Sequence, residues 1–417
     1  MRTRFTWVLG VLALIAIGLL IACSTKYSSS SNGLVVVPSQ GSTVMQSFSL
    51  DLNNGGISQI NNPSGPVTPG LPTALVLDPA GAFAYVLVTQ NSQITDSVTG
   101  IAVFPIASDG KLAAASSTTA FNPFGSVPVV PVALAIDSAG KFLFVANSVT
   151  VDGSGNAVPG TVSVFAVNNG TPSEVAGSPF AVPPGAMGPA NLTALGVSPT
   201  VFPPFFAACS EKSAPTSENL YVTDSENNTV WEFGVSSSGV LGNPLGDQSI
   251  LGFPTGTVPS GIAVDPCNQF VYVANQSPDN SISAYTVCNA ALIPTCATAD
   301  GSLVPVSSTF PTQGIGPGPM TENPYGNYLY VVNTLSNSVA SFKISPATGA
   351  LTAITPSPVA TNLSPVSIAV RSDGIWLFVA NFNSANVSQY AITPATGQLT
   401  QQTAFATDNL PFGVAVK

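Results

Sequence analysis

Residues 259–275 read PSGIAVDPCNQFVYVAN, two short apolar runs separated by an Asp-Pro turn. Residues 131–147 (PVALAIDSAGKFLFVAN) and 365–381 (PVSIAVRSDGIWLFVAN) repeat this pattern without gaps. Each run has the length of one strand, and the Asp, Pro, Ser and Gly residues between the runs favour a reversal of the chain. The stretch therefore predicts an antiparallel β-hairpin that recurs along the chain.

The hairpin pattern occurs seven times. Two copies carry substitutions, one is interrupted by an insertion and the last stops after its first strand; the copies start at residues 72, 131, 192, 259, 317, 365 and 411. Most copies continue into a second strand pair, as at 337–342, which is closed by a Pro-Ala-Thr-Gly turn, as at 346–349. Four antiparallel strands repeated seven times predict an all-β fold, the seven-bladed β-propeller.

The two ends of the repeat array complement each other. Residues 411–416 supply one inner strand without a continuation, and the segments 34–37, 44–50 and 56–60 supply three strands without an inner one. Both pieces are predicted to share one blade, which closes the ring and leaves no exposed inner edge. A solenoid, the alternative repeat architecture, would need a capping repeat at each end.

The first residues have the pattern of an export signal. Arg2 and Arg4 precede a weakly polar to apolar stretch that ends Leu20-Ile21-Ala22-Cys23,. This ending resembles the lipobox of bacterial lipoproteins, which implies that Cys23 is lipidated and becomes the new N-terminus. An uncleaved N-terminal anchor is the alternative interpretation.

Three segments follow from these patterns: a lipoprotein signal peptide at 1–22, a flexible tether at 23–32 and the propeller at 33–417. The tether is rich in serine and ends in an asparagine, a polar composition typical of flexible linkers,. The predicted location is the bacterial cell envelope, with the outer membrane or periplasm favoured, and the membrane is a partner through the lipid. We expect a monomer.

Composition excludes several functions. The chain has no histidine, which removes Ser-His and Cys-His nucleophile pairs and imidazole metal ligands,. It has 9 basic and 19 acidic residues, a net charge of −10. Because so few cations cannot neutralise a run of phosphates, nucleic acid and anionic lipid surfaces are not expected partners.

The cysteines beyond Cys23 suggest disulfide bonds that stabilise the structure. An even number in an exported chain is typical of disulfides; they are Cys209, Cys267, Cys288 and Cys296,. Local closure favours Cys288–Cys296 and leaves Cys209–Cys267 between adjacent blades, although three connectivities exist. A four-thiolate metal site is the rival interpretation, but the chain has no Cys-x-x-Cys pair,.

The repeats also resemble a known family. Tyr272-Val-Ala-Asn275, Tyr330-Val-Val-Asn333 and Phe378-Val-Ala-Asn381 are similar to YVTN-type repeats. The blade count and the Pro-Ala-Thr-Gly turns resemble the seven-bladed lactonase-like family, which includes 6-phosphogluconolactonases and cycloisomerases. The resemblance implies a lactone hydrolase. Such enzymes hold phosphate with Arg or Lys, and the cycloisomerases use His and Glu with arginines. This chain lacks histidine and has very few cations, so the family's site residues cannot be transferred to it.

Recurring polar residues are predicted to be structural. Asp78, Asp137 and Asp265 stand in the turns after the first strand and should accept backbone N–H bonds,. An asparagine ends the second strand in four copies and is expected to bridge neighbouring loops; these are Asn147, Asn275, Asn333 and Asn381. The binding mouth is expected on the opposite face from the aspartate turns.

One inner-strand position breaks the apolar pattern. The fifth copy has Glu322 where the others have Leu, Ile or Val, and Arg371, the only arginine beyond the leader, lies one position further in the next copy. A buried carboxylate is costly unless it is paired. We therefore predict that Glu322 and Arg371 approach each other near the channel, as a structural ion pair or as catalytic residues.

No cofactor or metal site is predicted. The acids expected on the mouth side could bind Ca²⁺, but their spacing matches no calcium loop; they are Asp96, Asp152, Asp224, Glu226 and Asp279,.

The predicted function is a lipid-anchored binding module whose mouth or rim recognises an envelope protein, a glycan or another envelope component. The alternative is a hydrolase of a neutral lactone in which Glu322 or an aspartate activates water. A quinone- or metal-dependent dehydrogenase is disfavoured because its cofactor contacts require cations or histidines.

Overall fold

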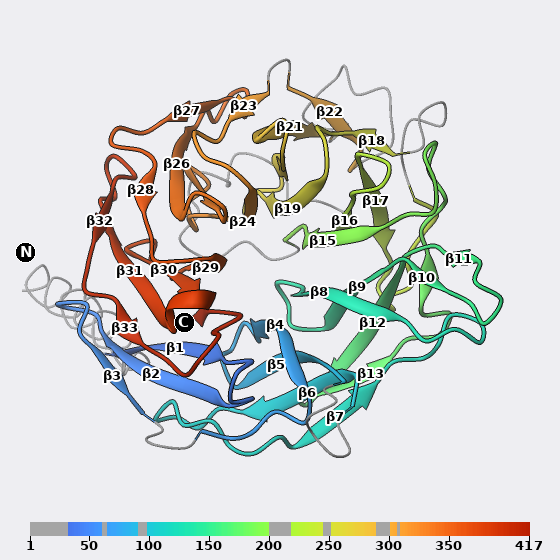
Figure 1. The fold of residues 1–417 in the computed structure, drawn as a ribbon, viewed down its shortest axis with the longest axis horizontal. Coiled ribbons are helices and arrows are strands. Elements are labelled where there is room, and N and C mark those ends of the chain that lie inside the picture. The colour runs from blue at the N-terminus through green and yellow to red at the C-terminus, as the bar shows by residue number, and fades with distance from the viewer. Residues whose placement is uncertain are drawn as a thin grey trace, which may run out of the picture.

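The computed structural model describes residues 32–60, 65–90, 98–199, 218–244, 252–288, 301–306 and 309–417. Seven antiparallel sheets surround one axis, as Figure 1 shows, and the short 3-10 helix η1 (Phe382–Ser384) is the only helix in these residues. The predicted all-β, seven-bladed propeller is confirmed.

Blades 1 to 4 follow the chain, and their strands are given from the axis outward. Blade 1 contains β4 (Leu71–Leu77), β5 (Phe83–Thr89), β6 (Gly100–Pro105) and β7 (Ser117–Ala120). Blade 2 contains β8 (Val130–Ile136), β9 (Phe142–Ser148), β12 (Thr161–Asn168) and β13 (Thr171–Glu174), with β14 (Phe180–Ala181) beside β12 and the hairpin β10 (Thr150–Val151) and β11 (Ala157–Val158) before it. Blade 3 contains β15 (Leu192–Val197), β16 (Glu218–Asp224), β17 (Thr229–Val235) and β18 (Phe253–Pro254). Blade 4 contains β19 (Pro259–Val264), β20 (Phe270–Asn275), β21 (Ser281–Val287), β22 (Leu303–Pro305) and β23 (Phe310–Pro311).

Blades 5 to 7 complete the ring. Blade 5 contains β24 (Pro317–Glu322), β25 (Tyr328–Asn333), β26 (Ser338–Ile344), β27 (Leu351–Ala353) and β28 (Val359–Ala360). Blade 6 contains β29 (Pro365–Val370), β30 (Trp376–Asn381), β31 (Asn386–Ile392), β32 (Leu399–Gln401) and β33 (Phe405–Ala406). Blade 7 contains β34 (Ala415–Val416), β1 (Asn32–Pro38), β2 (Met45–Asp51) and β3 (Ile57–Gln59).

Blade 7 joins the two ends of the described chain. In β1 and β34, Val35 pairs with Val416 and Val36 with Ala415. Leu34 and Lys417 exchange backbone bonds of 3.0 and 2.9 Å. The predicted closure by one shared blade is therefore correct, and it leaves no inner strand unpaired.

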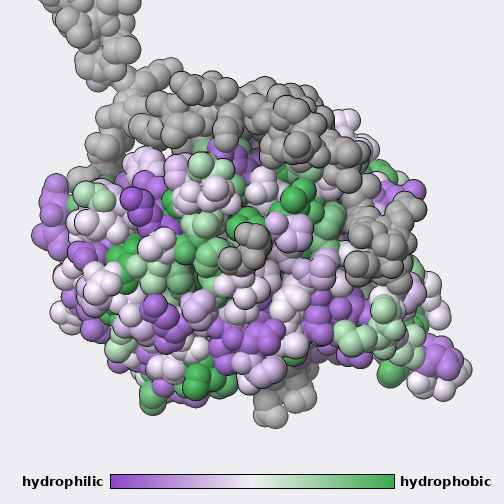
Figure 2. Space-filling view, turned by 90° about the horizontal axis from the view of Figure 1, so that it is seen from above, coloured by the Kyte–Doolittle hydropathy of each residue, from purple (hydrophilic) through white to green (hydrophobic). Residues whose placement is uncertain are grey.

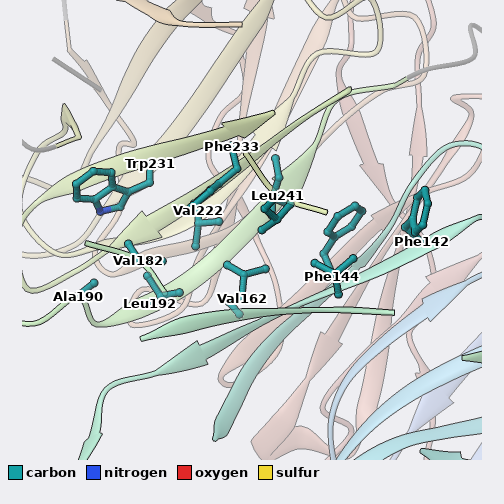
Figure 3. Packing of buried hydrophobic residues seen from close by; sticks show 13 residues of the cluster. Phe142, Phe144, Val162, Val182, Ala190, Leu192, Val222, Trp231, Phe233 and Leu241 are labelled. Atoms are coloured by element: carbon teal, nitrogen blue, oxygen red, sulfur yellow. The ribbon is translucent and has the colours of Figure 1, made fainter. Parts of the chain in front are cut away.

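The hydrophobic core lies between the blades. The second strand of each blade is buried on both faces because another blade packs on each side, so it is a near-continuous apolar run,. The third strands are also mostly buried but include serines and other polar residues. Figure 3 shows one such layer, a single cluster of buried residues that includes Phe144 of β9, Val222 of β16 and Phe233 of β17. The stacking of blades, rather than a single central core, stabilises the ring.

Two faces follow from the antiparallel strands. The turns between the inner and second strands and between the third and outer strands share one face, which we call the turn face. The loops between the second and third strands, and those that lead to the next blade, share the opposite face, which we call the mouth face. Asn32 and Lys417 lie on the turn face, whereas the bridge between Ser39 and Pro411 lies on the mouth face.

Side chains connect neighbouring blades around the mouth face. Six inner strands have a β-bulge close to their start, as between Pro259 and Gly261. At two of these bulges the extra residue carries a hydroxyl that donates to the next blade: Thr193 Oγ1 donates to Pro259 O (2.7 Å) and Ser260 Oγ to Pro317 O (2.8 Å). The bulge thus turns these side chains toward the neighbouring blade.

Candidate binding site at the mouth face

The recurring turn aspartates have the predicted structural role. Asp78 Oδ1 accepts Phe83 N (2.6 Å), Asp137 Oδ1 accepts Phe142 N (2.9 Å), and Asp265 Oδ2 accepts Gln269 N (2.9 Å). Each carboxylate holds the turn that starts the second strand. These aspartates belong to the frame of the blades.

The recurring asparagines are also structural, although most of their partners differ from those expected. Asn147 Nδ2 donates to Ser163 (3.0 Å), Asn275 Nδ2 to Ser283 (3.0 Å), and Asn381 Nδ2 to Ser388 (2.9 Å). These bonds connect the second and third strands of one blade. Asn333 Nδ2, as expected, also reaches a neighbouring loop, where it donates to Thr312 O (3.3 Å). All of these asparagines are fully buried, so they do not contact a ligand in this state.

The predicted ion pair between Glu322 and Arg371 does not form. The Arg371 guanidinium binds Asp373 and donates to Lys417 O (3.2 Å), toward blade 7. Glu322 is buried near Asp265 and Tyr272 of blade 4, and neither of its oxygens has a hydrogen-bond partner. Successive side chains of an extended strand point to opposite sides, so an offset of one residue sends the two groups apart.

Glu322 is also unsuited to act as the base of a hydrolase. Burial raises its pKa well above the usual value, with a second contribution from the nearby Asp265 carboxylate. Burial without a partner therefore favours the protonated acid, and in that form Glu322 cannot accept a proton from water. Glu322 is the only charged residue in the described inner strands, whose other residues are apolar or carry hydroxyls.

The mouth-side acids act as loop caps. Asp224 is fully buried and accepts Asn191 N (2.9 Å), Asn227 Nδ2 (2.6 Å) and Trp231 Nε1 (3.4 Å). Asp152 accepts bonds from Asn156, which lower its pKa, and Asp279 Oδ2 accepts Thr257 N (2.6 Å). Asp96 lies outside the described residues. Within the described part of the chain, no group of three acidic, cysteine or histidine side chains could hold a metal ion.

The predicted disulfides cannot be followed to both ends. Neither Cys267 nor Cys288 is a free thiol, but Cys209 and Cys296, their predicted partners, lie outside the described residues. The pairing stays a prediction. Cys23 and the predicted signal peptide also lie outside the described residues, and no helix within the described ranges is long and apolar enough to cross a membrane.

Charge is unevenly distributed between the two faces. Every cation of the described chain stands in or beside a turn of the turn face; these are Lys111, Lys141, Lys343, Arg371 and Lys417. Within the same ranges, the charged residues in the loops of the mouth face are all acidic; they are Asp152, Asp224, Glu226, Asp279 and Asp408. The mouth face therefore favours neutral or positively charged ligands and repels anions.

Exposed apolar side chains occur in mouth-face loops around the ring, and those of blades 5 to 7 are connected by short contacts. Ile315, Leu335 and Leu363 are 53%, 70% and 58% exposed in these loops, and the half-buried Phe382 and Phe412 lie on the mouth face of blades 6 and 7. We call these five residues the rim stripe. By contrast, Figure 2 shows polar and apolar residues intermixed on the side wall of the propeller.

Short contacts connect the members of the rim stripe. Leu335 N donates to Ile315 O (3.1 Å), and Phe382 N donates to Ser364 O (2.9 Å), next to Leu363. The rings of Phe382 and Phe412 meet edge to face with centroids 6.1 Å apart. Exposed apolar residues that lie close together are typical of a binding surface.

The surroundings of the rim stripe are uncharged except at its ends. Asn383 Nδ2 donates to Ser364 Oγ (2.7 Å) and Ser384 Oγ accepts Leu363 N (2.9 Å), so amides and hydroxyls lie beside the apolar residues. Asp279 precedes Asn280, whose Oδ1 accepts Gly316 N (2.9 Å) at one end, and Asp408 lies in the loop of Phe412 at the other. The surface offers apolar contact and neutral hydrogen bonds.

Sequence reasoning missed the rim stripe. Its signal was present, since Ile315, Leu335 and Leu363 are single large apolar residues inside loops of Asn, Ser, Thr and Gly. Nothing in the chain order shows that three separate loops place them on one face, because the loops belong to successive blades that only the ring brings together.

Comparisons with known proteins agree with this architecture. Residues 306–416 match the family described as Lactonase, 7-bladed beta-propeller. A putative 6-phosphogluconolactonase from Bacteroides fragilis is 18% identical over 94% of this chain and 99% of its own, with a TM-score of 0.69. The periplasmic gluconolactonase of Pseudomonas aeruginosa is 17% identical over 93% and 99%, with a TM-score of 0.70.

The chain has the fold of the lactonase-like seven-bladed β-propellers. None of the curated proteins matches it. Identities below one fifth show the likeness of fold alone, and the activities named for the two solved structures belong to those proteins,. What this lactonase-like propeller binds must therefore be argued from its own mouth face.

Proposed function

We propose that this lactonase-like propeller is an envelope-anchored binding protein that recognises an uncharged ligand, such as a neutral glycan, at the rim stripe. The distribution of charge carries the proposal. No cation of the described chain lies on the mouth face, where the exposed apolar residues and their flanking amides and hydroxyls provide the contacts. Apolar contact with a few oriented polar groups is typical of sites for neutral ligands.

The anchor would place this face away from the membrane. Asn32, the first residue of β1, lies on the turn face, opposite the mouth. A tether of residues 23–32 reaches roughly 35 Å at full extension. With lipid on Cys23, the turn face would therefore stand toward the membrane and the rim stripe would be open to the envelope space.

The charge distribution argues against a phosphorylated sugar. Phosphate recognition normally uses Arg or Lys as bidentate or point-charge partners. Two of the turn-face cations are already paired, Lys111 with Asp109 and Arg371 with Asp373. A phosphate at the mouth would meet carboxylates instead.

A hydrolase of a neutral lactone is the second candidate, favoured by the family match of residues 306–416. Lactone opening needs a base that activates water. Since Glu322 is buried and protonated, an exposed mouth acid such as Glu226 would have to serve. The product would be a carboxylate, which the acidic mouth would repel.

The test uses the full mature chain with two panels, neutral oligosaccharides in calorimetry and neutral or 6-phosphorylated gluconolactone in a turnover assay. We expect binding to a neutral oligosaccharide that falls at least tenfold in Leu335→Ser/Leu363→Ser. The matched control is Val240→Ser, which changes an exposed apolar residue on the turn face. Turnover of a lactone that is lost in Glu226→Gln would establish the hydrolase instead.

A further inference from the structure

Three successive junctions between blades bury a glutamate. Glu218 lies between blades 2 and 3, Glu232 between blades 3 and 4, and Glu322 between blades 4 and 5. The junctions around blades 6, 7 and 1 contain no buried glutamate in the described residues. A buried carboxyl without a hydrogen bond is costly, and far more so when it is charged.

Glu218 starts β16 and faces the turn of blade 2. It is 9% exposed, its Oε1 has no partner, and Asp137 and Lys141 are the charged groups near it. Burial raises the pKa of Glu218 to about 7, Asp137 raises it further, and Lys141 opposes the shift. Asp137 is itself buried, which raises its pKa as well.

Glu232 lies in the middle of β17 and is fully buried, with both oxygens unpartnered. A side chain on Gly301 of blade 4 would collide with Glu232 Oε1 and Asn219 Nδ2, so the carboxyl faces the blade 4 turn. Tyr221, which donates its hydroxyl to Gly301 O (3.0 Å), is the titratable group beside it. Burial alone raises the pKa of Glu232 to about 8.

The other blades have neutral residues in the place of Glu232. The aligned third-strand positions hold Ala284, Ser341 and Gln389, and Gln389 Nε2 donates to Gly55 O (2.9 Å) of the next blade. A protonated glutamic acid has nearly the shape of this glutamine. When Glu232 is protonated, this third-strand position is therefore uncharged in blade 3, as it is in the other blades.

Glu322 ends β24 and faces blade 4. Both of its oxygens are unpartnered, and the titratable groups near it are Asp265 and Tyr272. The equivalent residue in blade 6 is Val370. As at the other two junctions, no described cation pairs with this glutamate.

We propose that Glu218, Glu232 and Glu322 are protonated when the ring is intact and that together they form an alkali-sensitive lock on blades 2 to 5. Under mildly acidic conditions the three junctions close around neutral acids. As the surroundings become alkaline, ionisation of the buried carboxyls forces these junctions apart, while blades 6, 7 and 1 stay packed.

The direction of the pH dependence follows from proton linkage. An unfolded glutamate has a pKa near 4.5, so between that value and its raised folded value the folded protein holds a proton that the unfolded chain has released. Within this window each group raises the unfolding equilibrium constant about tenfold per pH unit. The window runs from 4.5 to about 7 for Glu218 and from 4.5 to about 8 for Glu232. The buried glutamates thus contribute their full stabilisation below pH 4.5, and this contribution is lost as the pH rises toward their folded pKa values.

The absence of histidine fits such a lock. Buried neutral histidines normally destabilise a protein as the pH falls, and this chain has none,. Protonation of buried histidines therefore does not lower the stability of this protein at acidic pH. An envelope protein is exposed to the external pH, so the stability of this protein would be highest where its surroundings are mildly acidic.

The decisive experiment compares urea unfolding of the full mature chain with Glu218→Gln/Glu232→Gln/Glu322→Gln at pH 5, 7 and 9. Glutamine keeps the shape and stays neutral, so the triple variant should keep its midpoint while the wild-type midpoint falls steadily. Glu226→Gln, an exposed glutamate, is the matched control and should behave as wild type. Equal pH dependence in the wild-type and triple-variant proteins would overturn the lock.

A second measurement holds even where the triple variant folds poorly. Infrared spectra of wild-type protein at pH 6.5 should contain the carbonyl band of protonated carboxylic acids. Hydrogen exchange, corrected for intrinsic rates, should increase first in β16, β17 and β24 as the pH rises from 6 to 9. A missing band, or earlier opening of β30 and β31, would contradict the proposal. Neither readout depends on the ligand of the rim stripe.

Discussion

Val35 and Val416 pair in one antiparallel sheet, although they lie near opposite ends of the propeller chain. This contact joins β1 to β34 and completes blade 7 between blades 6 and 1. Because a propeller blade is buried by both neighbours, the loss of one inner strand exposes the apolar faces of two others.

Truncation after Leu410 should therefore abolish cooperative unfolding and expose apolar surface. We expect a broad urea transition and strong binding of a hydrophobic dye. A synthetic peptide of residues 411–417, added in trans, should restore the transition because it can pair with β1 as β34 does. An unchanged midpoint in the truncated chain would show that closure contributes little.

Tyrosine hydroxyls link consecutive blades on the turn face. Tyr272 donates to Gly349 O (2.9 Å) and Tyr330 to Gly397 O (3.0 Å). Tyr272→Phe should destabilise the protein by about 1 to 2 kcal/mol, because the buried carbonyl loses its partner. Urea unfolding measures this loss. Tyr325→Phe removes an exposed hydroxyl and should change stability by less than about 0.5 kcal/mol,.

Asp224 organises the mouth loop of blade 3. Its carboxylate collects bonds from Asn191, Asn227 and Trp231 while fully buried. Asp224→Ala should lower stability by about 3 kcal/mol and alter the fluorescence of Trp231, because several donors lose their acceptor together. Asp152→Ala, in an exposed loop, is the control and should cost under about 1 kcal/mol,. Similar losses in both variants would refute the special role of Asp224.

Glu322→Val should stabilise the protein, and the gain should grow with pH. Because burial favours the protonated form of Glu322, folding becomes less favourable as the unfolded glutamate ionises with rising pH, a cost that valine does not have,. We expect about 1 to 3 kcal/mol at pH 8 and a smaller gain at pH 5, measured by urea unfolding. Val370→Ile, at the equivalent site of blade 6, should show no such pH dependence. A gain that is constant with pH would contradict a protonated Glu322.

Much of the fold could be predicted because strands and turns follow from patterns within a few neighbouring residues. Residues 259–275 contain a strand, a turn and a second strand, and Asp265 holds the turn as expected. Repetition at intervals of one blade then indicates the number of blades. The incomplete repeat at 411–416 indicates the closure, since an unpaired inner strand needs a partner.

The candidate site was harder to predict because it depends on side-chain direction. Glu322 and Arg371 are close in the repeat alignment, yet the first faces blade 4 and the second faces blade 7. A shift of one residue reverses the direction of a side chain on an extended strand. An alignment of repeats gives the position along a strand but does not say which neighbouring blade a side chain meets.

The sequence by itself determined the strands, the turns, the seven units and their closure, because hydrophobic alternation and turn residues act within a few positions of the chain. Only the tertiary structure decided that the described cations share one face, that Ile315, Leu335 and Leu363 are exposed on the other, and that three glutamates are buried between blades. The physical reason is that blades stack face to face, so the neighbours that set charge, burial and protonation come from a different repeat.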